Sequence, residues 1–176
     1  SRALGISRAG IWKYMQELRK EGYDIVAVPH LGYKLLSSPD KLLSHEIQFG
    51  LATKVFGRNI VHYDSLSSTM DAAFELGVKE APEGTVVCAE AQTKGRGRLQ
   101  RSWASPKYKG IYLSLSLRPA LLPSQAPILT LLSARSICEA IKDTVDLIVN
   151  IKWPNDILLG NKKIGGILTE LNAEMD

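Results

Sequence analysis

Few residues in this sequence belong to the types that build metal centres or covalent catalysts. Only two cysteines and three histidines occur among 176 residues. Cys88 and Cys138 lack the short spacing of zinc ligands, and we expect two buried free thiols rather than a disulfide. His45 and His62 are expected to be structural, and His30 to be an exposed turn residue or a contact to a DNA phosphate. No nucleophilic triad can be recognised.

Long apolar runs are also missing. No segment reaches the roughly 18 residues of a membrane span, and no secretory signal, internal repeat or low-complexity tract is present. The net charge of +4 is far from that of a histone-like polycation, whereas 45% hydrophobic residues can bury a core. We expect a cytoplasmic protein of one or two domains with no membrane partner. The ends SRALGIS and TELNAEMD look like interior sequence, so we expect a piece of a longer chain.

Positive charge is concentrated at the start of the chain. Residues 1–38 contain six Lys and Arg against three Asp and Glu, whereas the remaining 138 residues contain sixteen against fifteen. A small basic head on a nearly neutral body indicates a separate module that binds a polyanion. The stretch SSPDK at 37–41 is a plausible linker, which gives domains at 1–38 and 39–176.

The head has the pattern of a partial winged helix-turn-helix. Ser7 is a good N-cap, and Gly22 stands where a left-handed residue would end a helix. Between them an apolar stripe recurs at helical spacing, formed by Ile11, Met15 and Leu18. The stretches DIVAV and YKLLS, joined by PHLG, predict a short hairpin, the wing.

The exposed face of the head helix is predicted to bind DNA. It carries Arg8, Trp12, Lys13 and Arg19. We assign DNA contacts to Ser7, Arg8, Trp12 and Lys13. The alternative is an ordinary amphipathic helix with a solvated cationic face, but the order of turn, helix and wing favours recognition of DNA.

Strands and helices alternate in the remaining sequence. The fold class is therefore α/β (α+β), with a mixed, largely antiparallel sheet. Helices are predicted near 44–54, 68–76 and 125–142, and strands near 60–63, 84–92 and 110–119. A hairpin spanning 147–171 follows, with a reverse turn at Gly160 and Asn161.

A basic loop, QTKGRGRLQRSWASP at 92–106, separates two of these predicted strands. It contains four cations and no acid. It is not an RNA-binding arginine–glycine repeat, and it lacks the Gly-Lys-Ser/Thr and following helix of a Walker loop. We favour a loop that closes over a triphosphate, with backbone N–H groups near Gly95 and Gly97 approaching the phosphates. The alternative is a solvated charged loop that buries Trp103.

Three motifs in order, GRGRLQRSW, KWPND and KKIGGILTE, resemble the catalytic core of biotin protein ligases. With the winged-helix head, the chain is most similar to the bifunctional class that combines the ligase with a biotin-operon repressor. The resemblance extends from Leu4 to Leu171 and implies a class II synthetase-like core, a biotin–lipoate ligase fold. It implies synthesis of biotinyl-5′-adenylate from biotin and ATP, and transfer of biotin to a lysine of a biotin carboxyl carrier protein. It also implies operator DNA as a partner, and adenylate occupancy is expected to favour a homodimer.

The resemblance also implies roles for individual residues. Biotin contacts are expected from Ser68, Thr69, Gln92, Gly95, Arg96, Lys163 and Gly166. Catalytic roles are expected for Lys163, Arg98 and Arg96, which would neutralise charge as a carboxylate meets a phosphate. The adenylate loop and ATP site are expected to comprise Arg98, Arg101, Trp103, Lys152 and Asn155.

The KWPND motif is expected to help hold nucleotide. Pro154 fixes the direction of Asn155 and Asp156, whose hard oxygen ligands suit a Mg²⁺ shared with the phosphates, Asp156 being the expected metal ligand. Trp153 is expected to flank the adenine or the biotin. Taken alone, the motif would predict a turn with a core tryptophan.

Two positions depart from the family pattern. Gln100 stands where the family has glycine, so a left-handed backbone there would be strained by roughly 1–2 kcal/mol. We expect a loop that closes less well on the adenylate. Met70 stands where an amide residue is usual, which removes one polar contact to the ligand.

Two other functions remain open on the sequence. A lipoate–protein ligase would share the enzyme class, although the Gly-Arg-Gly-Arg loop argues against it. A transcription factor that senses biotin without turning it over would share the head, although Lys163 and the arginine loop favour retained chemistry.

Overall fold

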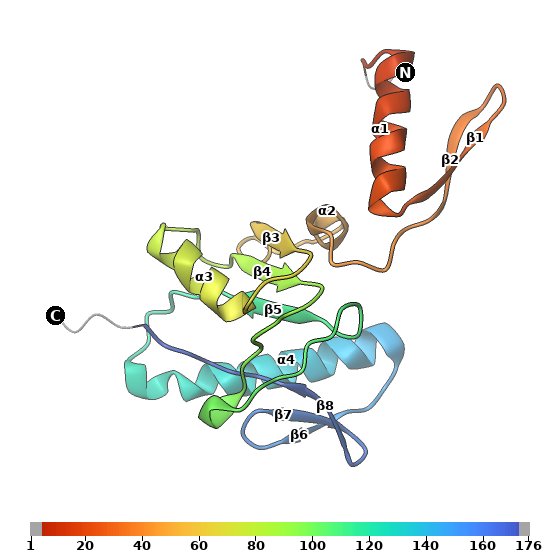
Figure 1. The fold of residues 1–176 in the computed structure, drawn as a ribbon. Helices are drawn as coiled ribbons and strands as arrows, with labels where there is room; N and C mark the ends of the chain where they lie inside the picture. Colours follow the sequence, from red (N-terminus) through yellow and green to blue (C-terminus); the bar gives the residue numbers. More distant parts are fainter. Residues whose placement is uncertain (1–4, 173–176) are drawn as a thin grey trace. The chain divides into compact units, whose positions relative to one another are not determined.

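The computed structural model describes residues 5–172. The chain divides into two compact units, Ser1–Leu42 and Leu43–Asp176, called here the head and the core unit (Figure 1). Each is described by itself. None of the helices in the described residues combines the length and the apolar character needed to cross a membrane.

Within residues 5–42 the head comprises one helix and one hairpin. Helix α1 (Arg8–Glu21) begins at Ser7, whose side chain accepts a hydrogen bond from the N–H of Gly10, and ends at Gly22 with φ 110°. Both predicted caps are confirmed, because a serine oxygen satisfies an open helix donor and glycine adopts the left-handed conformation without strain. Strand β1 (Asp24–Val28) pairs antiparallel with β2 (Gly32–Ser37), as the wing pattern predicts.

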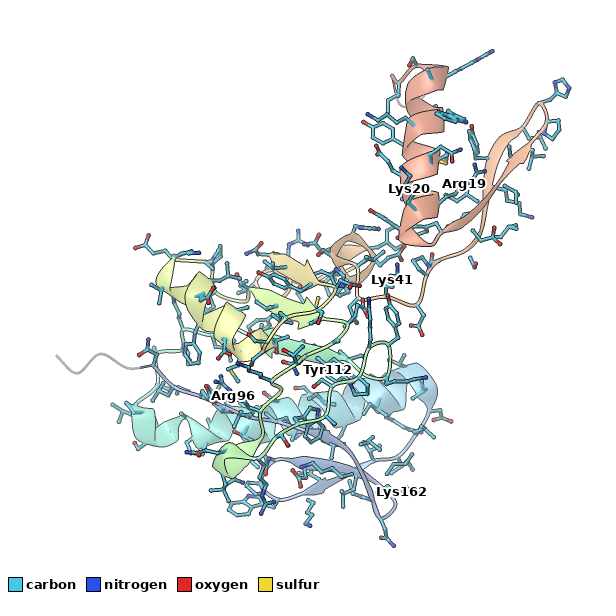
Figure 2. The ribbon with its side chains drawn as sticks, in the orientation of Figure 1. Arg19, Lys20, Lys41, Arg96, Tyr112 and Lys162 are labelled. Carbon is cyan, nitrogen blue, oxygen red and sulfur yellow. The ribbon has the colours of Figure 1, made fainter. Side chains whose placement is uncertain are left out.

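The cationic face of α1 is smaller than the sequence predicts. Arg8, Trp12 and Lys13 are exposed. Arg19 is not part of that face, because its guanidinium donates two hydrogen bonds to the carbonyl of Ile25, at 2.9 and 2.6 Å. It ties α1 to β1 instead, and Figure 2 shows it on the side of α1 toward the hairpin. Leu4, in the turn expected before the helix, lies outside the described residues.

The first sheet of the core unit has the order β3-β4-β5. Strands β3 (Ile60–Tyr63) and β4 (Val86–Ala89) run parallel, and β5 (Tyr112–Leu115) is antiparallel to β4. Helix α3 (Thr69–Val78) packs on β4 and β5. The side chains of β4 are the most buried in the sheet: Val87, Cys88 and Ala89 are at most 1% exposed. This strand therefore anchors the basic loop that follows it.

The second sheet has the order β6-β7-β8 and is antiparallel throughout. Its strands are β6 (Asn150–Lys152), β7 (Asp156–Leu159) and β8 (Lys162–Gly166). The long helix α4 (Pro127–Val145) packs against β6 and β7. The hairpin expected over 147–171 is confirmed, with Gly160 at φ 58° in the turn between β7 and β8.

Three details differ from the sequence expectation. Within residues 43–172 the strands form two three-stranded sheets, not one. The helix expected near 44–54 is only α2 (Ser44–Gln48), because the chain turns extended at Phe49 and left-handed at Gly50. Both cysteines are free as expected, but only Cys88 is buried, while Cys138 on α4 is partly exposed.

Candidate active site

The N-terminus of α3 and the segment after β4 are joined by backbone hydrogen bonds. The N–H of Lys94 donates to the carbonyl of Ser67 at 2.8 Å, and that of Thr93 to Leu66 at 2.9 Å. Ser68 caps α3 by accepting from the N–H of Met70 at 3.2 Å. This bond fixes the Ser68 side chain at the start of α3, and only 2% of Ser68 is exposed.

The Gln92 side chain is fixed by groups on both sides. Its Oε1 accepts from the N–H of Thr69 at 2.8 Å and from Thr69 Oγ1 at 3.0 Å. Its Nε2 donates to Ser105 Oγ at 3.0 Å, and Ser114 Oγ lies 2.9 Å from Thr69 Oγ1. The structure therefore brings the expected polar set together and adds Ser105 and Ser114. The alternation of leucine and serine in β5 would place Leu113 and Leu115 inward, whereas the structure buries Ser114 and exposes both leucines. No sequence pattern marks Ser105.

The basic loop folds back on itself over this polar set. The N–H of Trp103 donates to the carbonyl of Gly95 at 2.8 Å, and that of Gly97 to Arg101 at 2.7 Å. A side chain at Gly95 would lie 2.4 Å from the Trp103 carbonyl and 2.7 Å from Ser105 Oγ. Only glycine permits so close an approach, which explains this residue of the motif.

The tip of the loop is a short 3₁₀ turn, Arg98–Gln100, in a strained conformation. Leu99 has φ 55° and Gln100 has φ 58°. The left-handed backbone expected at Gln100 is confirmed, and Leu99 shares it. Two adjacent side chains in this region cost stability that glycine would not.

Arg96 links the loop to two neighbouring segments. Its Nη2 lies 2.7 Å from Asp71 Oδ1 on α3 and 3.4 Å from Glu170 Oε2, after β8. Figure 2 labels Arg96 within the core unit, below α3. The sequence did not predict that either acid would pair with Arg96, because they lie 25 and 74 residues from it along the chain. The charge of Arg96 is thus offset by carboxylates of the same chain.

Arg98 joins the loop to the KWPND motif. Its Nη1 donates to Asn155 Oδ1 at 3.0 Å, and Asn155 Nδ2 donates to the carbonyl of Ile167 at 3.2 Å. The Ile167 N–H returns a bond to the carbonyl of Asn155 at 2.9 Å. Asn155 is therefore held at the junction of the loop, the β6–β7 connection and the end of β8.

Lys163 lies where the loop meets the second sheet. Its Nζ is 2.6 Å from Asp156 Oδ1 on the neighbouring strand and 5.1 Å from the centre of the Trp103 ring. A side chain at Gly166 would lie 3.4 Å from Lys163 Nζ and 3.5 Å from Trp103, so Gly166 keeps this space open. An ammonium group over an indole face and beside a carboxylate is well placed to exchange one anion for another.

The remaining predicted residues are less constrained. Arg101 and Lys152 are exposed. Trp153 is 77% exposed, so the core tryptophan that the motif alone would predict is wrong. No group of three or more His, Cys, Asp and Glu residues suited to a metal occurs within residues 5–172. The side chains of Asn155 and Asp156 offer oxygens, and one oxygen of each contacts a cation: Asn155 Oδ1 accepts from Arg98, and Asp156 Oδ1 pairs with Lys163.

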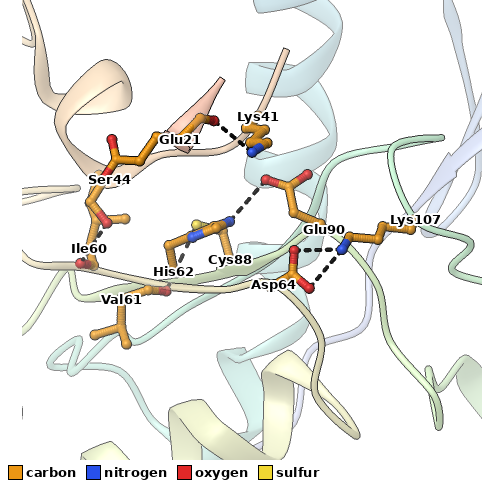
Figure 3. A network of polar contacts seen from close by, with 10 residues as sticks. All are labelled: Glu21, Lys41, Ser44, Ile60, Val61, His62, Asp64, Cys88, Glu90 and Lys107. Carbon is orange, nitrogen blue, oxygen red and sulfur yellow. Dashed lines mark hydrogen bonds and ion pairs between the residues drawn. The ribbon is translucent and has the colours of Figure 1, made fainter. Parts of the chain in front are cut away.

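A second polar network lies on β3, β4 and the loop beyond (Figure 3). His62 Nε2 lies 2.9 Å from Glu90 Oε1, and Lys107 Nζ lies 2.6 Å from Asp64 Oδ1. Burial, reinforced by the negative charge of Glu90, raises the pKa of the Cys88 thiol to about 11. Such a thiol is inert at neutral pH. These contacts support the expected structural role of His62.

Comparison with known proteins identifies two families in the chain. Residues 62–175 match the model of the Biotin/lipoate A/B protein ligase family, and residues 1–34 match an HTH domain. The chain is 49% identical over 176 residues to the "Bifunctional ligase/repressor BirA" of Bacillus subtilis, covering 100% of this chain and 54% of that protein. It is 34% identical over 171 residues to the protein of the same description from Escherichia coli, covering 97% and 52%.

Solved structures agree with this assignment. The biotin protein ligase of Aquifex aeolicus in complex with biotin and ATP superposes with a TM-score of 0.55 at 34% identity, covering 65% of this chain and 47% of that one. The Leishmania major enzyme in complex with biotinyl-5-AMP gives 0.59 at 30% identity, covering 65% and 53%. The chain spans about half the length of the curated relatives it matches. The family match covers most of the core unit, and the chain belongs to the Biotin/lipoate A/B protein ligase family.

Proposed function

We propose that the protein is a biotin–protein ligase whose head binds operator DNA. One observation carries the enzymatic part. The loop after β4 delivers Arg98 and Trp103 to the second sheet, where Asn155, Asp156 and Lys163 meet them. A cationic cluster of this kind suits the joining of two anions, which is the chemical difficulty in activating a carboxylate with ATP.

In the first step, a carboxylate oxygen of biotin attacks the α-phosphorus of ATP. An O–P bond forms, the bond to the β-phosphate oxygen breaks, and pyrophosphate leaves, giving biotinyl-5′-adenylate. Lys163 and Arg98 offset the charge that gathers as the two anions approach. Asp156 and Asn155, their present partners, hold both cations in place before the ligand arrives.

In the second step, the amine of a carrier-domain lysine attacks the acyl carbon of the mixed anhydride. A C–N bond forms, AMP leaves, and the amine loses a proton. No protein nucleophile is required, in agreement with the lack of a nucleophilic triad in the sequence. The acceptor is a biotin carboxyl carrier protein.

The remaining roles follow the position of each residue. Ser68, Thr69, Gln92, Gly95 and Gly166 would bind biotin, together with Arg96 and Lys163. Arg98, Arg101, Trp103, Lys152 and Asn155 would surround the nucleotide. Asp156 and Asn155 have the oxygen donors that Mg²⁺ accepts alongside phosphates, and the ion would supply further neutralisation of phosphate charge.

The test of the enzyme is formation of the adenylate by the full-length protein. With ATP and biotin, mass spectrometry should detect biotinyl-adenylate, and pyrophosphate release should depend on biotin. Lipoate in place of biotin should give neither product. Adenylation of lipoate alone would assign the chain to the lipoate branch of the family, and binding of biotin without turnover would make the core a sensor only.

The repressor function rests on the HTH match and on the exposed Arg8, Trp12 and Lys13 of α1. Ser7 would contact DNA from the start of the same helix. Adenylate formation would raise operator affinity by favouring a homodimer, and the protein would act in the cytoplasm. Operator binding measured with and without biotin and ATP tests this coupling, which equal affinities would contradict.

A further inference from the structure

Four side chains of the core unit, three of them buried, form one continuous hydrogen-bonded chain. Its order is Ser114, Thr69, Gln92 and Ser105, and it ends on the carbonyl of Trp103, 3.2 Å from Ser105 Oγ. Thr69, Ser105 and Ser114 are all buried. Isolated serines in such a setting would be costly, whereas a fully satisfied network specifies one arrangement.

The direction of every bond in this chain follows from the donors and acceptors available. The backbone N–H of Thr69 can only donate, so the Gln92 atom 2.8 Å away must be the oxygen. The Thr69 hydroxyl donates its single proton to the same oxygen. Ser114 must therefore be the donor in its contact with Thr69.

The other end of the chain is equally constrained. Since Gln92 Oε1 is fixed, its Nε2 is the group that donates to Ser105. Ser105 in turn donates to the Trp103 carbonyl, which has no proton to give. The Gln92 amide cannot rotate by half a turn without placing its NH₂ against the Thr69 N–H.

The Gln92 amide can offer a ligand one N–H group. Its oxygen has accepted two hydrogen bonds, and one of its two N–H groups is used by Ser105. The second N–H has no partner among the described residues, and Gln92 is partly exposed. Beside it, Ser68 accepts from Met70 and still has its own O–H to donate. Both groups are hydrogen-bond donors.

We propose that Ser105 and Ser114 are positioning residues that lock the Gln92 amide as a hydrogen-bond donor, so that this subsite selects a ring carrying a carbonyl acceptor. The proposal rests on the proposed function and specifies how the ring of biotin is recognised. The urea of biotin presents one carbonyl oxygen, which can accept two hydrogen bonds. A ring with a donor at that position would face the fixed N–H of Gln92.

Ser105 also couples this selection to the basic loop. It bonds the Trp103 carbonyl, while the Trp103 N–H bonds the Gly95 carbonyl, and Gly95 lies against both Ser105 and Gln92 Nε2. The backbone N–H of Gln92 donates to the Ser105 carbonyl at 3.2 Å. The loop conformation and the orientation of the amide are thus set by the same serine.

The experiment measures ligand discrimination by isothermal titration of the full-length protein. Three probes are compared: biotin, an analogue whose ring carbonyl oxygen is replaced by an imino N–H, and an analogue that keeps the urea but lacks the sulfur. The wild type should prefer biotin to the imino analogue by about 100-fold or more, since a mismatched buried donor is costly. Ser105→Ala should reduce this preference by about tenfold, and Ser114→Ala by about threefold.

Several comparisons separate positioning from a structural effect. The preference for biotin over the sulfur-free analogue should stay within about twofold of wild type in every variant, because both ligands carry the same carbonyl. Ser105→Thr, which retains the hydroxyl, should restore the preference. Ser116→Ala is the matched control, since its side chain makes no hydrogen bond to the described residues and lies two positions beyond Ser114.

The possible outcomes are distinct. Failure of the wild type to bind biotin overturns the proposed function and this inference with it. Tight biotin binding, with an unchanged imino preference in both alanine variants, overturns the inference and leaves the proposed function standing. If Ser105→Ala does not fold, Ser114→Ala alone decides: a reduced preference supports the lock, and an unchanged preference contradicts it.

Discussion

Three cations at the candidate site already have partners from their own chain. Arg96 is paired with Asp71 and Glu170, Arg98 with Asn155, and Lys163 with Asp156. These three cations are therefore held within the chain without a bound anion. An incoming phosphate or carboxylate must instead exchange with these partners. Exposed pairs of this kind are weak, so exchange costs little.

Lys163 provides a sharp test at the residue scale. Lys163→Met should lower biotin-dependent pyrophosphate exchange by about 100-fold or more, because one charge that stabilises the transition state is lost. Lys162→Met is the matched control. Lys162 is exposed on the same strand (Figure 2), and its side chain makes no hydrogen bond to the described residues. Equal losses in the two variants would contradict a specific role for Lys163.

Gln100 gives a second test, on the strained turn. Gln100→Gly should stabilise the closed loop by about 1 kcal/mol, because glycine adopts φ 58° without strain. Release of the adenylate should then slow by about fivefold. Gln100→Ala removes the same side chain but keeps the strain, and should release the intermediate at the wild-type rate. The rate is read from the decay of ligand fluorescence or radioactivity after dilution.

The buried thiol of Cys88 should make the free energy of unfolding depend on pH in the alkaline range. Its pKa is about 11 in the folded protein against 9.0 for an ordinary thiol. Between these two values the folded state retains a proton that the unfolded state loses. The contribution of Cys88 to the free energy of unfolding is therefore complete below pH 9 and disappears as the pH rises toward 11. Denaturant unfolding of Cys88→Ala should show a shallower loss of stability across that range. Identical slopes in wild type and variant would contradict the assignment.

At the scale of elements, periodicity and caps predicted most of the secondary structure. The stripe of Ile11, Met15 and Leu18, with Ser7 and Gly22 at its ends, defines α1 correctly. The helix expected near 44–54 was predicted too long, because the apolar residues of the sequence continue past Gly50, where the backbone turns left-handed. The division into two sheets could not be predicted, because strand pairing depends on tertiary contacts that local patterns do not contain.

Replacement of individual glycines in the core unit is expected to change its stability according to the backbone conformation at each position. Gly84, before β4, has φ 77°, and an added side chain would lie 2.5 Å from the Val55 carbonyl oxygen. Gly84→Ala should therefore destabilise the core unit by about 2–4 kcal/mol in denaturant unfolding. Gly77→Ala is the control, since nothing lies near that position inside α3 and alanine favours a helix. It should leave stability unchanged or raise it by up to about 1 kcal/mol.

At the scale of the whole molecule, the proposed function assigns recognition of DNA to the head and chemistry to the core unit. Much of the candidate site could be predicted from motifs, since Ser68, Gln92, Arg98, Asn155 and Lys163 all stand in recognisable stretches. The partners that hold them in place could not. Asp71 and Glu170 lie 25 and 74 residues from Arg96, and Ser105 lies 13 residues from Gln92, so no local pattern shows that folding brings these partners together.

The salt dependence of operator DNA binding should depend on the positive charges of the head. Lys13→Gln should weaken binding and reduce the slope of log affinity against log salt by about 1, because one phosphate contact is lost. Lys79→Gln, an exposed change at the end of α3 in the core unit, should leave that slope unchanged. Equal slopes for all three proteins would contradict a DNA contact by Lys13.

The most direct test is a crystal structure of the full-length protein with biotinyl-adenylate. If the account holds, Lys163 Nζ and the Arg98 guanidinium will lie about 3 Å from oxygens of the acyl phosphate, and the Asp156–Lys163 contact will have lengthened. An adenylate bound elsewhere, or at this site with both side chains turned into solvent, would contradict it.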